Sequence, residues 1–163
     1  MKFAYADPPY PGQAKRWYGN HRDYDGEVDY AHLIDRIMGE YPDGWALSTS
    51  AAALREVLIM CPADVRVAIW NRPNSEPPGN RGRWHWMWEP LIVRGGRQKY
   101  GDAPAVRDLL TCSKPQGLIP GEKPPAFTRW MIDLLGYREG DDLDDLFPGS
   151  KAITKELAQG ILL

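Results

Sequence analysis

The 163-residue sequence is poor in cysteine and has no marked excess of either charge. Its two cysteines, Cys61 and Cys112, lie far apart without metal-ligand spacing, so the sequence implies neither a disulfide framework nor a metal site. The formal net charge of −2 argues against a protein that coats nucleic acid by bulk charge, although it leaves room for a local basic strip. No apolar run approaches membrane-spanning length, and no basic-then-apolar signal opens the chain. We therefore expect a cytoplasmic protein without a membrane partner.

What the sequence does contain is an alternation of short apolar runs with stretches of helical periodicity. The expected strands are 2–6, 45–48, 65–70, 84–94, 106–112 and 143–147, and the expected helices are 29–40, 51–60, 124–135 and 151–159. Strands that alternate with helices predict one α/β domain over residues 1–163, with a mainly parallel sheet and helices on both faces.

A Pro-Pro turn directly follows the first expected strand. In open α/β sheets ligands bind beyond the carboxyl ends of the strands, and Asp7-Pro8-Pro9-Tyr10 stands at such an end. The Asp7 carboxylate and a rigid backbone carbonyl, that of Pro8, can each accept one N–H of a planar amine and expose its lone pair to a methyl donor. Tyr10 offers a ring for an extruded base. The alternative is an ordinary loop in which Asp7 caps a turn.

Together with Asp145-Leu146-Phe147-Pro148-Gly149-Ser150, this turn resembles two motifs of the S-adenosylmethionine-dependent adenine amino-methyltransferases of the DPPY/DPPW type. The motif order is the permuted one. It is similar to that of the mRNA adenosine methyltransferase catalytic-subunit family and of short bacterial and phage DNA methylases. The segment 88–95 and the Lys123-Pro124 pair also match.

The resemblance implies a Rossmann-like methyltransferase fold and S-adenosylmethionine as the cofactor. It assigns catalysis to Asp7, Pro8, Pro9 and Tyr10, and cofactor binding to Asp7, Lys123, Asp145, Phe147, Gly149 and Ser150. From the residues themselves, Gly149 permits close backbone approach and Asp145 can receive the cofactor ammonium. The alternative for this segment is a plain strand–turn–helix in which Ser150 is the N-cap.

Two departures from the family pattern stand out. The family loop ends in a glycine where this chain has Lys151, which either fills the pocket or pairs with the cofactor carboxylate. We also expect the domain to be shortened at its C-terminus, with an exposed sheet edge that a homodimer would cover. These departures motivate a second hypothesis, a catalytically inactive methyltransferase-fold protein that binds nucleic acid or a partner subunit.

Basic and aromatic residues in two loops are candidate contacts to a nucleic-acid substrate, with DNA favoured over RNA. Besides Tyr10 they are Lys15, Arg16, Trp17, Arg81 and Arg83. Trp84, Trp86 and Trp88 alternate along the expected strand 84–94. They form either a stacking surface or a packed strand face, and we favour the packed face for Trp86 and Trp88.

Overall fold

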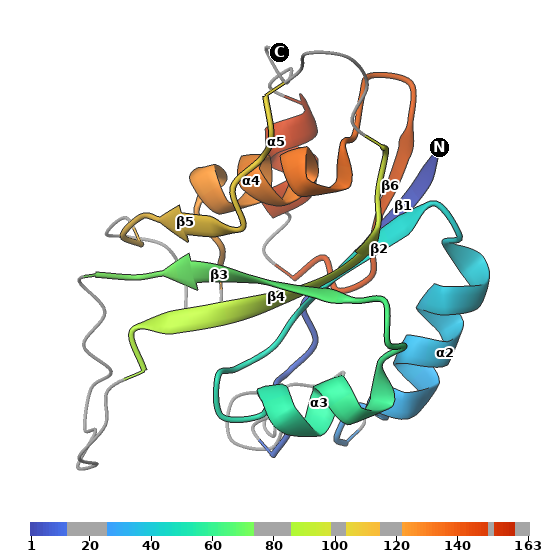
Figure 1. Cartoon of the computed structure of the whole chain (residues 1–163), viewed down its shortest axis with the longest axis vertical. Coiled ribbons are helices and arrows are strands. Elements are labelled where there is room, and N and C mark those ends of the chain that lie inside the picture. The colour runs from blue at the N-terminus through green and yellow to red at the C-terminus, as the bar shows by residue number, and fades with distance from the viewer. Residues whose placement is uncertain (13–25, 74–85, 99–103, 115–121, 150–151, 159–163) are drawn as a thin grey trace.

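The computed structural model describes residues 1–12, 26–73, 86–98, 104–114, 122–149 and 152–158. These residues form a six-stranded sheet in the order β5-β3-β4-β2-β1-β6 (Figure 1). The strands are β1 (Lys2–Ala6), β2 (Gly44–Ser48), β3 (Arg66–Asn71), β4 (Trp88–Gly95), β5 (Leu109–Thr111) and β6 (Asp142–Asp145). β1 runs parallel to β2 and β6, and β5 runs parallel to β3. β4 is antiparallel to both of its neighbours, so every strand except β4 points the same way.

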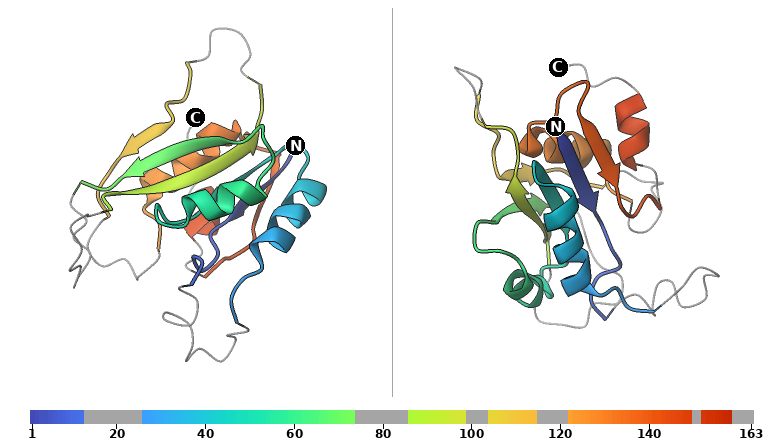
Figure 2. Two further views of the ribbon diagram at one scale, coloured as in Figure 1. Left: turned by 60° about the horizontal axis from the view of Figure 1, so that its bottom comes forward. Right: turned by 90° about the vertical axis from the view of Figure 1, so that its right-hand side faces the viewer.

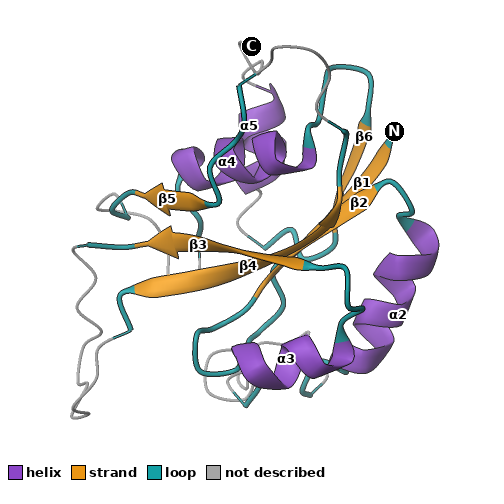
Figure 3. Cartoon of the chain, in the orientation of Figure 1, coloured by secondary structure: helices purple, strands orange, loops and turns teal. Residues whose placement is uncertain are grey.

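Two pairs of helices cover the two faces of this sheet (Figures 2 and 3). α2 (Tyr30–Glu40) and α3 (Leu54–Met60) pack on one face, and α4 (Pro125–Leu135) and α5 (Ala152–Ala158) pack on the other. Alternation along β1 explains the two cores: Phe3 and Tyr5 belong to the core under α4 and α5, whereas Ala4 and Ala6 belong to the core under α2 and α3. Among the described residues, no helix has the length and apolar character needed to cross a membrane.

Local signals explain where the two longest helices begin and where α4 ends. The Asp29 carboxylate caps α2 by accepting a hydrogen bond from the His32 N–H at 3.0 Å. α4 starts directly after Pro124 and ends at Gly136, whose left-handed φ of 64° suits glycine. The structure thus confirms the expected helices 29–40 and 124–135 to within a residue.

The predicted elements, the mainly parallel sheet and the helices on both faces are confirmed, with four corrections to boundaries. Residues 51–53 form a turn, so the helix expected over 51–60 begins at Leu54. The strand expected over 106–112 is confined to Leu109–Thr111, because only this stretch pairs with β3. The strand expected over 143–147 ends at Asp145, where the chain turns toward Pro148.

The fourth correction concerns the expected strand 84–94 with its alternating tryptophans. The ladder between β3 and β4 ends at the pair Asn71–Trp88, so β4 starts at Trp88 and Trp86 precedes it. Trp86 is 48 % exposed and meets Trp88 edge-on, with ring centroids 6.0 Å apart. The packed-face interpretation is therefore wrong for Trp86. Trp84 lies outside the described residues.

Candidate functional site

The candidate site lies at the rim of the sheet where β1 and β6 end. The two strands are parallel neighbours, with Tyr5 opposite Asp145, and the Leu146 N–H donates to the Tyr5 carbonyl at 2.9 Å. From this rim the chain leaves β1 toward α2 on one face and leaves β6 toward α5 on the other (Figure 2). Such a divergence is the topological switch point at which open α/β sheets bind their ligands.

An ion pair fixes Asp7 at this rim. The Lys123 ammonium donates to both Asp7 carboxylate oxygens, at 2.9 Å to Oδ1 and 2.7 Å to Oδ2, and it also reaches the Tyr10 hydroxyl at 3.2 Å. Lys123 precedes α4, so the contact joins residues 116 apart in the chain. The Lys123 side chain is 8 % exposed and that of Asp7 is 19 % exposed, so the pair is largely removed from water.

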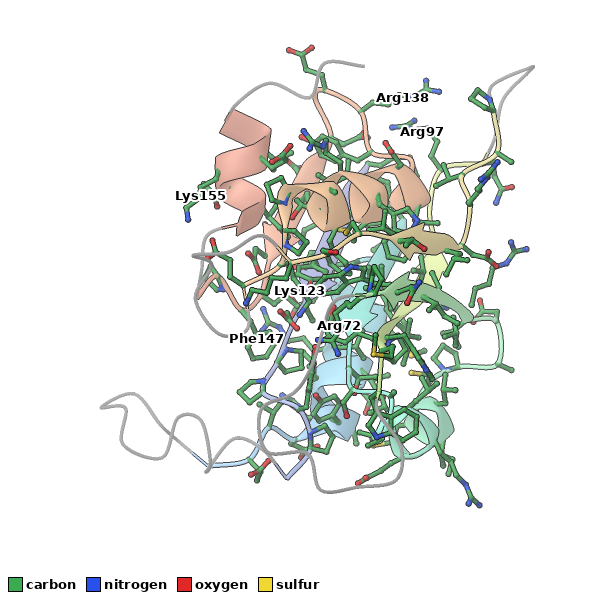
Figure 4. The ribbon with its side chains drawn as sticks, turned by 90° about the vertical axis from the view of Figure 1, so that its left-hand side faces the viewer. Arg72, Arg97, Lys123, Arg138, Phe147 and Lys155 are labelled. Carbon is green, nitrogen blue, oxygen red and sulfur yellow. The ribbon has the colours of Figure 1, made fainter. Side chains whose placement is uncertain are left out.

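A second carboxylate, Glu89, joins this pair from β4. The Tyr10 hydroxyl donates to Glu89 Oε2 at 2.9 Å, and Lys123 Nζ lies 3.6 Å from the same oxygen. The other carboxylate oxygen, Oε1, is held by Arg72 Nη1 at 2.7 Å. We call Asp7, Tyr10, Arg72, Glu89 and Lys123 the charge cluster. In Figure 4, Arg72 and Lys123 lie in the centre of the view near Phe147, whereas Arg97 and Arg138 lie well away from them.

Burial and charge act in opposite directions on the acid–base groups of this cluster. Burial raises the pKa of Asp7, and the nearby Glu89 adds to the rise, whereas the Lys123 ammonium opposes it; the net shift is upward. Burial lowers the pKa of Lys123, but the Asp7 and Glu89 carboxylates overcome this and leave it raised. Burial, Glu89 and Asp7 together raise the pKa of Tyr10 well above its usual range. Tyr10 therefore stays a neutral donor, and the Lys123 cation is stabilised between two acids.

The Pro-Pro turn is also held from α2. The Tyr30 hydroxyl donates to the Pro9 carbonyl at 3.2 Å, and Tyr30 itself is buried in the core under α2 and α3. Pro8 is buried and Pro9 is half-buried. The turn is thus fixed by its two rings, by Tyr30 on one side and by Lys123 on the other. Such preorganisation suits a group that must accept hydrogen bonds without rearranging.

The turn after β6 forms the other side of the site. Asp145 Oδ1 accepts a hydrogen bond from the Phe147 N–H at 3.2 Å, and the Gly149 N–H donates to the Phe147 carbonyl at 2.8 Å. Burial and the nearby Asp7 raise the pKa of Asp145, against the opposing Phe147 N–H. Gly149 does not have a left-handed φ, and a Cβ placed on it meets no atom within 4 Å. A ligand can therefore approach the Gly149 backbone closely.

The structure brings Asp7, Tyr10 and Lys123 into direct contact and places Asp145 beside β1 at the same rim. Glu89, Arg72 and Tyr30 also belong to the site, although no sequence motif pointed to them as site residues. A lone acid in the apolar run Trp88–Gly95 was the available signal for Glu89.

Several predicted residues lie outside the described residues: Lys15, Arg16, Trp17, Arg81, Arg83, Ser150 and Lys151. Among the described residues, no group of three or more potential metal ligands occurs.

Fold and rim together define a Rossmann-like α/β sheet in which the first and last described strands are adjacent. Among solved structures, this chain is similar to M1.HpyAVI, known from the crystal structure of its complex with SAM. The TM-score is 0.66 over 98 % of this chain and 78 % of that one, at 16 % sequence identity, so the likeness shows the fold. A comparison with models of protein families finds no match, and neither does one with curated proteins.

Proposed function

We propose that this chain is an S-adenosylmethionine-dependent methyltransferase that acts on the exocyclic amino group of adenine in nucleic acid, with DNA favoured over RNA. One observation supports the proposal above all others. The Asp7-Pro8-Pro9-Tyr10 turn and the Asp145–Gly149 turn leave neighbouring parallel strands at a switch point, so a methyl donor and an acceptor amine can meet between them.

On the acceptor side, Asp7 and the Pro8 carbonyl would each accept one N–H of the amine. A carboxylate has about four lone-pair sites. Lys123 takes one on each Asp7 oxygen, so acceptor capacity remains for the substrate. Because Tyr30 already donates to the Pro9 carbonyl, we assign the second bond to Pro8. Two acceptors fixed before substrate arrives favour pyramidal nitrogen without reorganisation.

On the donor side, the residues after β6 fit S-adenosylmethionine. The open approach to Gly149 admits a ligand against the backbone, and the half-buried Asp145 carboxylate suits a cationic group. When bound, this cofactor supplies an electrophilic methyl group on a sulfonium. Asp7 lies close enough to Asp145 to raise its pKa, so a cation between the two acids would be favoured electrostatically. M1.HpyAVI, which shares this fold, binds SAM in its crystal structure, and this supports the same cofactor here.

Transfer of a radiolabelled methyl group from S-adenosylmethionine tests the proposal directly. The acceptors are adenine-containing DNA and RNA oligonucleotides, single-stranded and duplex, and calorimetry measures cofactor binding separately. We expect Asp7→Ala to abolish transfer while the cofactor Kd changes only a few-fold. Asp64→Ala is the matched control, because this exposed carboxylate pairs with Arg94 elsewhere on the sheet.

Two results would contradict the proposal. Absence of cofactor binding up to millimolar concentration would favour an inactive binding protein on a methyltransferase scaffold. Cofactor binding without transfer to any oligonucleotide would remove the adenine assignment. Equal transfer to DNA and RNA would leave the reaction standing and overturn only the preference for DNA.

A further inference from the structure

We propose that Arg72 is a positioning residue for this reaction: it holds Glu89 so that Glu89 anchors Tyr10 without drawing Lys123 away from Asp7. The inference rests on the proposed function. No sequence signal pointed to Arg72, which directly follows β3 and is linked to Asp7 through Glu89 and Lys123.

Four contacts fix the Arg72 side chain and backbone. Its Nη1 pairs with Glu89 Oε1 at 2.7 Å, and its Nη2 donates to the Trp86 carbonyl at 3.4 Å. Its backbone N–H donates to the Met87 carbonyl at 2.7 Å, and its guanidinium carbon lies 5.5 Å from the centre of the Trp70 ring. Three of these contacts involve the planar guanidinium itself, and together they orient it toward the Glu89 carboxylate.

The division of the two Glu89 oxygens is the central observation. Oε1 faces Arg72, and Oε2 faces the Tyr10 hydroxyl and Lys123. The ion pair from Lys123 to Asp7 is shorter, at 2.7 Å, than its approach to Glu89, at 3.6 Å. Arg72 thus satisfies the acid that would otherwise compete with Asp7 for the one lysine between them.

Charges in the cluster alternate and balance. Asp7 and Glu89 carry one negative charge each, and Lys123 and Arg72 carry one positive charge each, so loss of Arg72 leaves a net negative cluster at a largely buried site. Glu89 already raises the pKa of Asp7, and without its own counterion it would do so more strongly. Arg72 therefore favours the ionised, hydrogen-bond-accepting form of Asp7.

Other ionisable groups face the cluster and remain in place when Arg72 is replaced. Tyr5 and Asp145 approach Asp7 from β1 and β6, and Tyr30 approaches it from α2. Lys114 lies near Lys123, Glu89 and Arg72, and Glu122 lies near Lys114. Loss of Arg72 also removes its repulsion of the Lys114 cation, and the charge-conserving variant Arg72→Lys separates the loss of charge from the loss of the guanidinium.

The experiment compares Arg72→Met with Arg72→Lys over the pH dependence of kcat. In Arg72→Met we expect the acid limb of the kcat profile to move to higher pH by about one unit. At a fixed pH on that limb, kcat is then about tenfold lower than in the wild type. Arg72→Lys keeps the positive charge, so its acid limb should lie at the same pH as that of the wild type. The double variant Arg72→Met with Glu89→Gln restores charge balance and should return the limb toward wild type.

Arg94→Met is the matched control. The Arg94 side chain on β4 is 27 % exposed, close to the 23 % of Arg72, but its partner is Asp64 at 2.9 Å, away from the charge cluster. We expect its pH profile to match wild type. An unchanged limb in Arg72→Met, or an equal shift in Arg94→Met, would reduce Arg72 to a structural role and overturn the inference.

A second readout separates this inference from the proposed function. Carbon-13 NMR of labelled aspartate carboxyls, with Asp7→Asn used for assignment, follows the titration of Asp7 without any turnover. An upward shift in Arg72→Met supports the inference even if no oligonucleotide is methylated, and an unshifted Asp7 overturns it even if the enzyme is active. Absence of methyl transfer in the wild type counts against the proposed function alone.

Discussion

The Asp7 side chain has two roles at the candidate site. It must be held in place at a half-buried rim, and in the proposed reaction it must still accept a hydrogen bond from substrate. The Lys123 ammonium meets the first demand by bonding both carboxylate oxygens. It also opposes the effect of burial on the Asp7 pKa, which keeps more of the carboxylate ionised. The Lys123 cation between Asp7 and Glu89 is therefore compatible with the role proposed for Asp7.

Gly149 offers a residue-scale prediction about the cofactor side. Its φ lies outside the left-handed region and a Cβ there meets no protein atom, so Gly149→Ala should leave the free energy of unfolding nearly unchanged. If S-adenosylmethionine packs against this backbone, the methyl group should raise the cofactor Kd about tenfold, or about 1.4 kcal/mol. Calorimetry and urea denaturation measure the two quantities.

The matched control for this substitution is Gly39→Ala in α2, where a Cβ is equally unobstructed. There we expect a small gain in stability, up to about 1 kcal/mol, from helix propensity, with no change in the cofactor Kd. Unchanged cofactor binding in Gly149→Ala would move the cofactor away from the turn after β6.

At the scale of elements, the sequence predicted what is encoded locally. The Asp29 cap, the Pro124 start and the Gly136 end are short-range signals, and α2 and α4 were accordingly predicted to within a residue. The direction of β4 is not encoded in this way, because an apolar run packs equally well in either direction. Being antiparallel, β4 brings its first residues to the rim where the other strands end, and Glu89 arrives there with them. The candidate site was therefore predicted at Asp7 and Asp145 and missed at Glu89.

The contact between α2 and the Pro-Pro turn leads to a prediction at this scale. Tyr30→Phe removes the hydrogen bond to the Pro9 carbonyl but keeps the buried ring. A neutral hydrogen bond contributes about 1 kcal/mol. Because the turn then loses one of its anchors, we expect kcat for methyl transfer to fall about fivefold with the cofactor Kd unchanged.

Tyr41→Phe is the comparison for Tyr30→Phe. Tyr41 ends the same helix and donates to Asp144 at 2.7 Å, outside the charge cluster. We expect a comparable loss of stability and an unchanged kcat. If both variants lower kcat equally, the effect comes from α2 as a whole and the anchoring role of Tyr30 is wrong.

At the scale of the whole molecule, the candidate site forms only when distant parts of the chain meet. β1 lies between β2 and β6, and the Asp7–Lys123 bond joins residues 116 apart. No local pattern specifies such a pairing. β6 lies at the edge of the described sheet and carries Asp142, Asp144 and Asp145. Like charges on an edge strand oppose its pairing with a second copy, so the homodimer through this edge stays a prediction with an electrostatic cost.

At the rim of the sheet opposite the candidate site, Arg97 links the loop after β4 to the segment between α4 and β6. Its Nε donates to the Gly136 carbonyl at 3.0 Å, and its Nη2 pairs with Asp141 at 2.6 Å. Burial alone would raise the pKa of Asp141, but the hydrogen bonds from Arg97 and neighbouring donors lower it below the ordinary range. A lowered pKa in the folded state stabilises the protein above the unfolded-state value of about 3.9. That stabilisation is lost as the pH falls through the folded-state pKa.

We therefore expect Arg97→Met to lower the free energy of unfolding by about 1–2 kcal/mol at pH 7. The difference from wild type should narrow as the pH falls below about 4, because Asp141 in the folded variant lacks the Arg97 cation and takes up a proton there, while Asp141 in the folded wild type stays ionised to lower pH. Urea denaturation at a series of pH values measures this difference. Arg36→Met removes an exposed pair with Glu40 on α2 and should show no such dependence. A difference for Arg97→Met that stays constant from pH 7 to pH 3 would mean that Arg97 stabilises the fold through packing and the Gly136 carbonyl, with no contribution from the charge of Asp141.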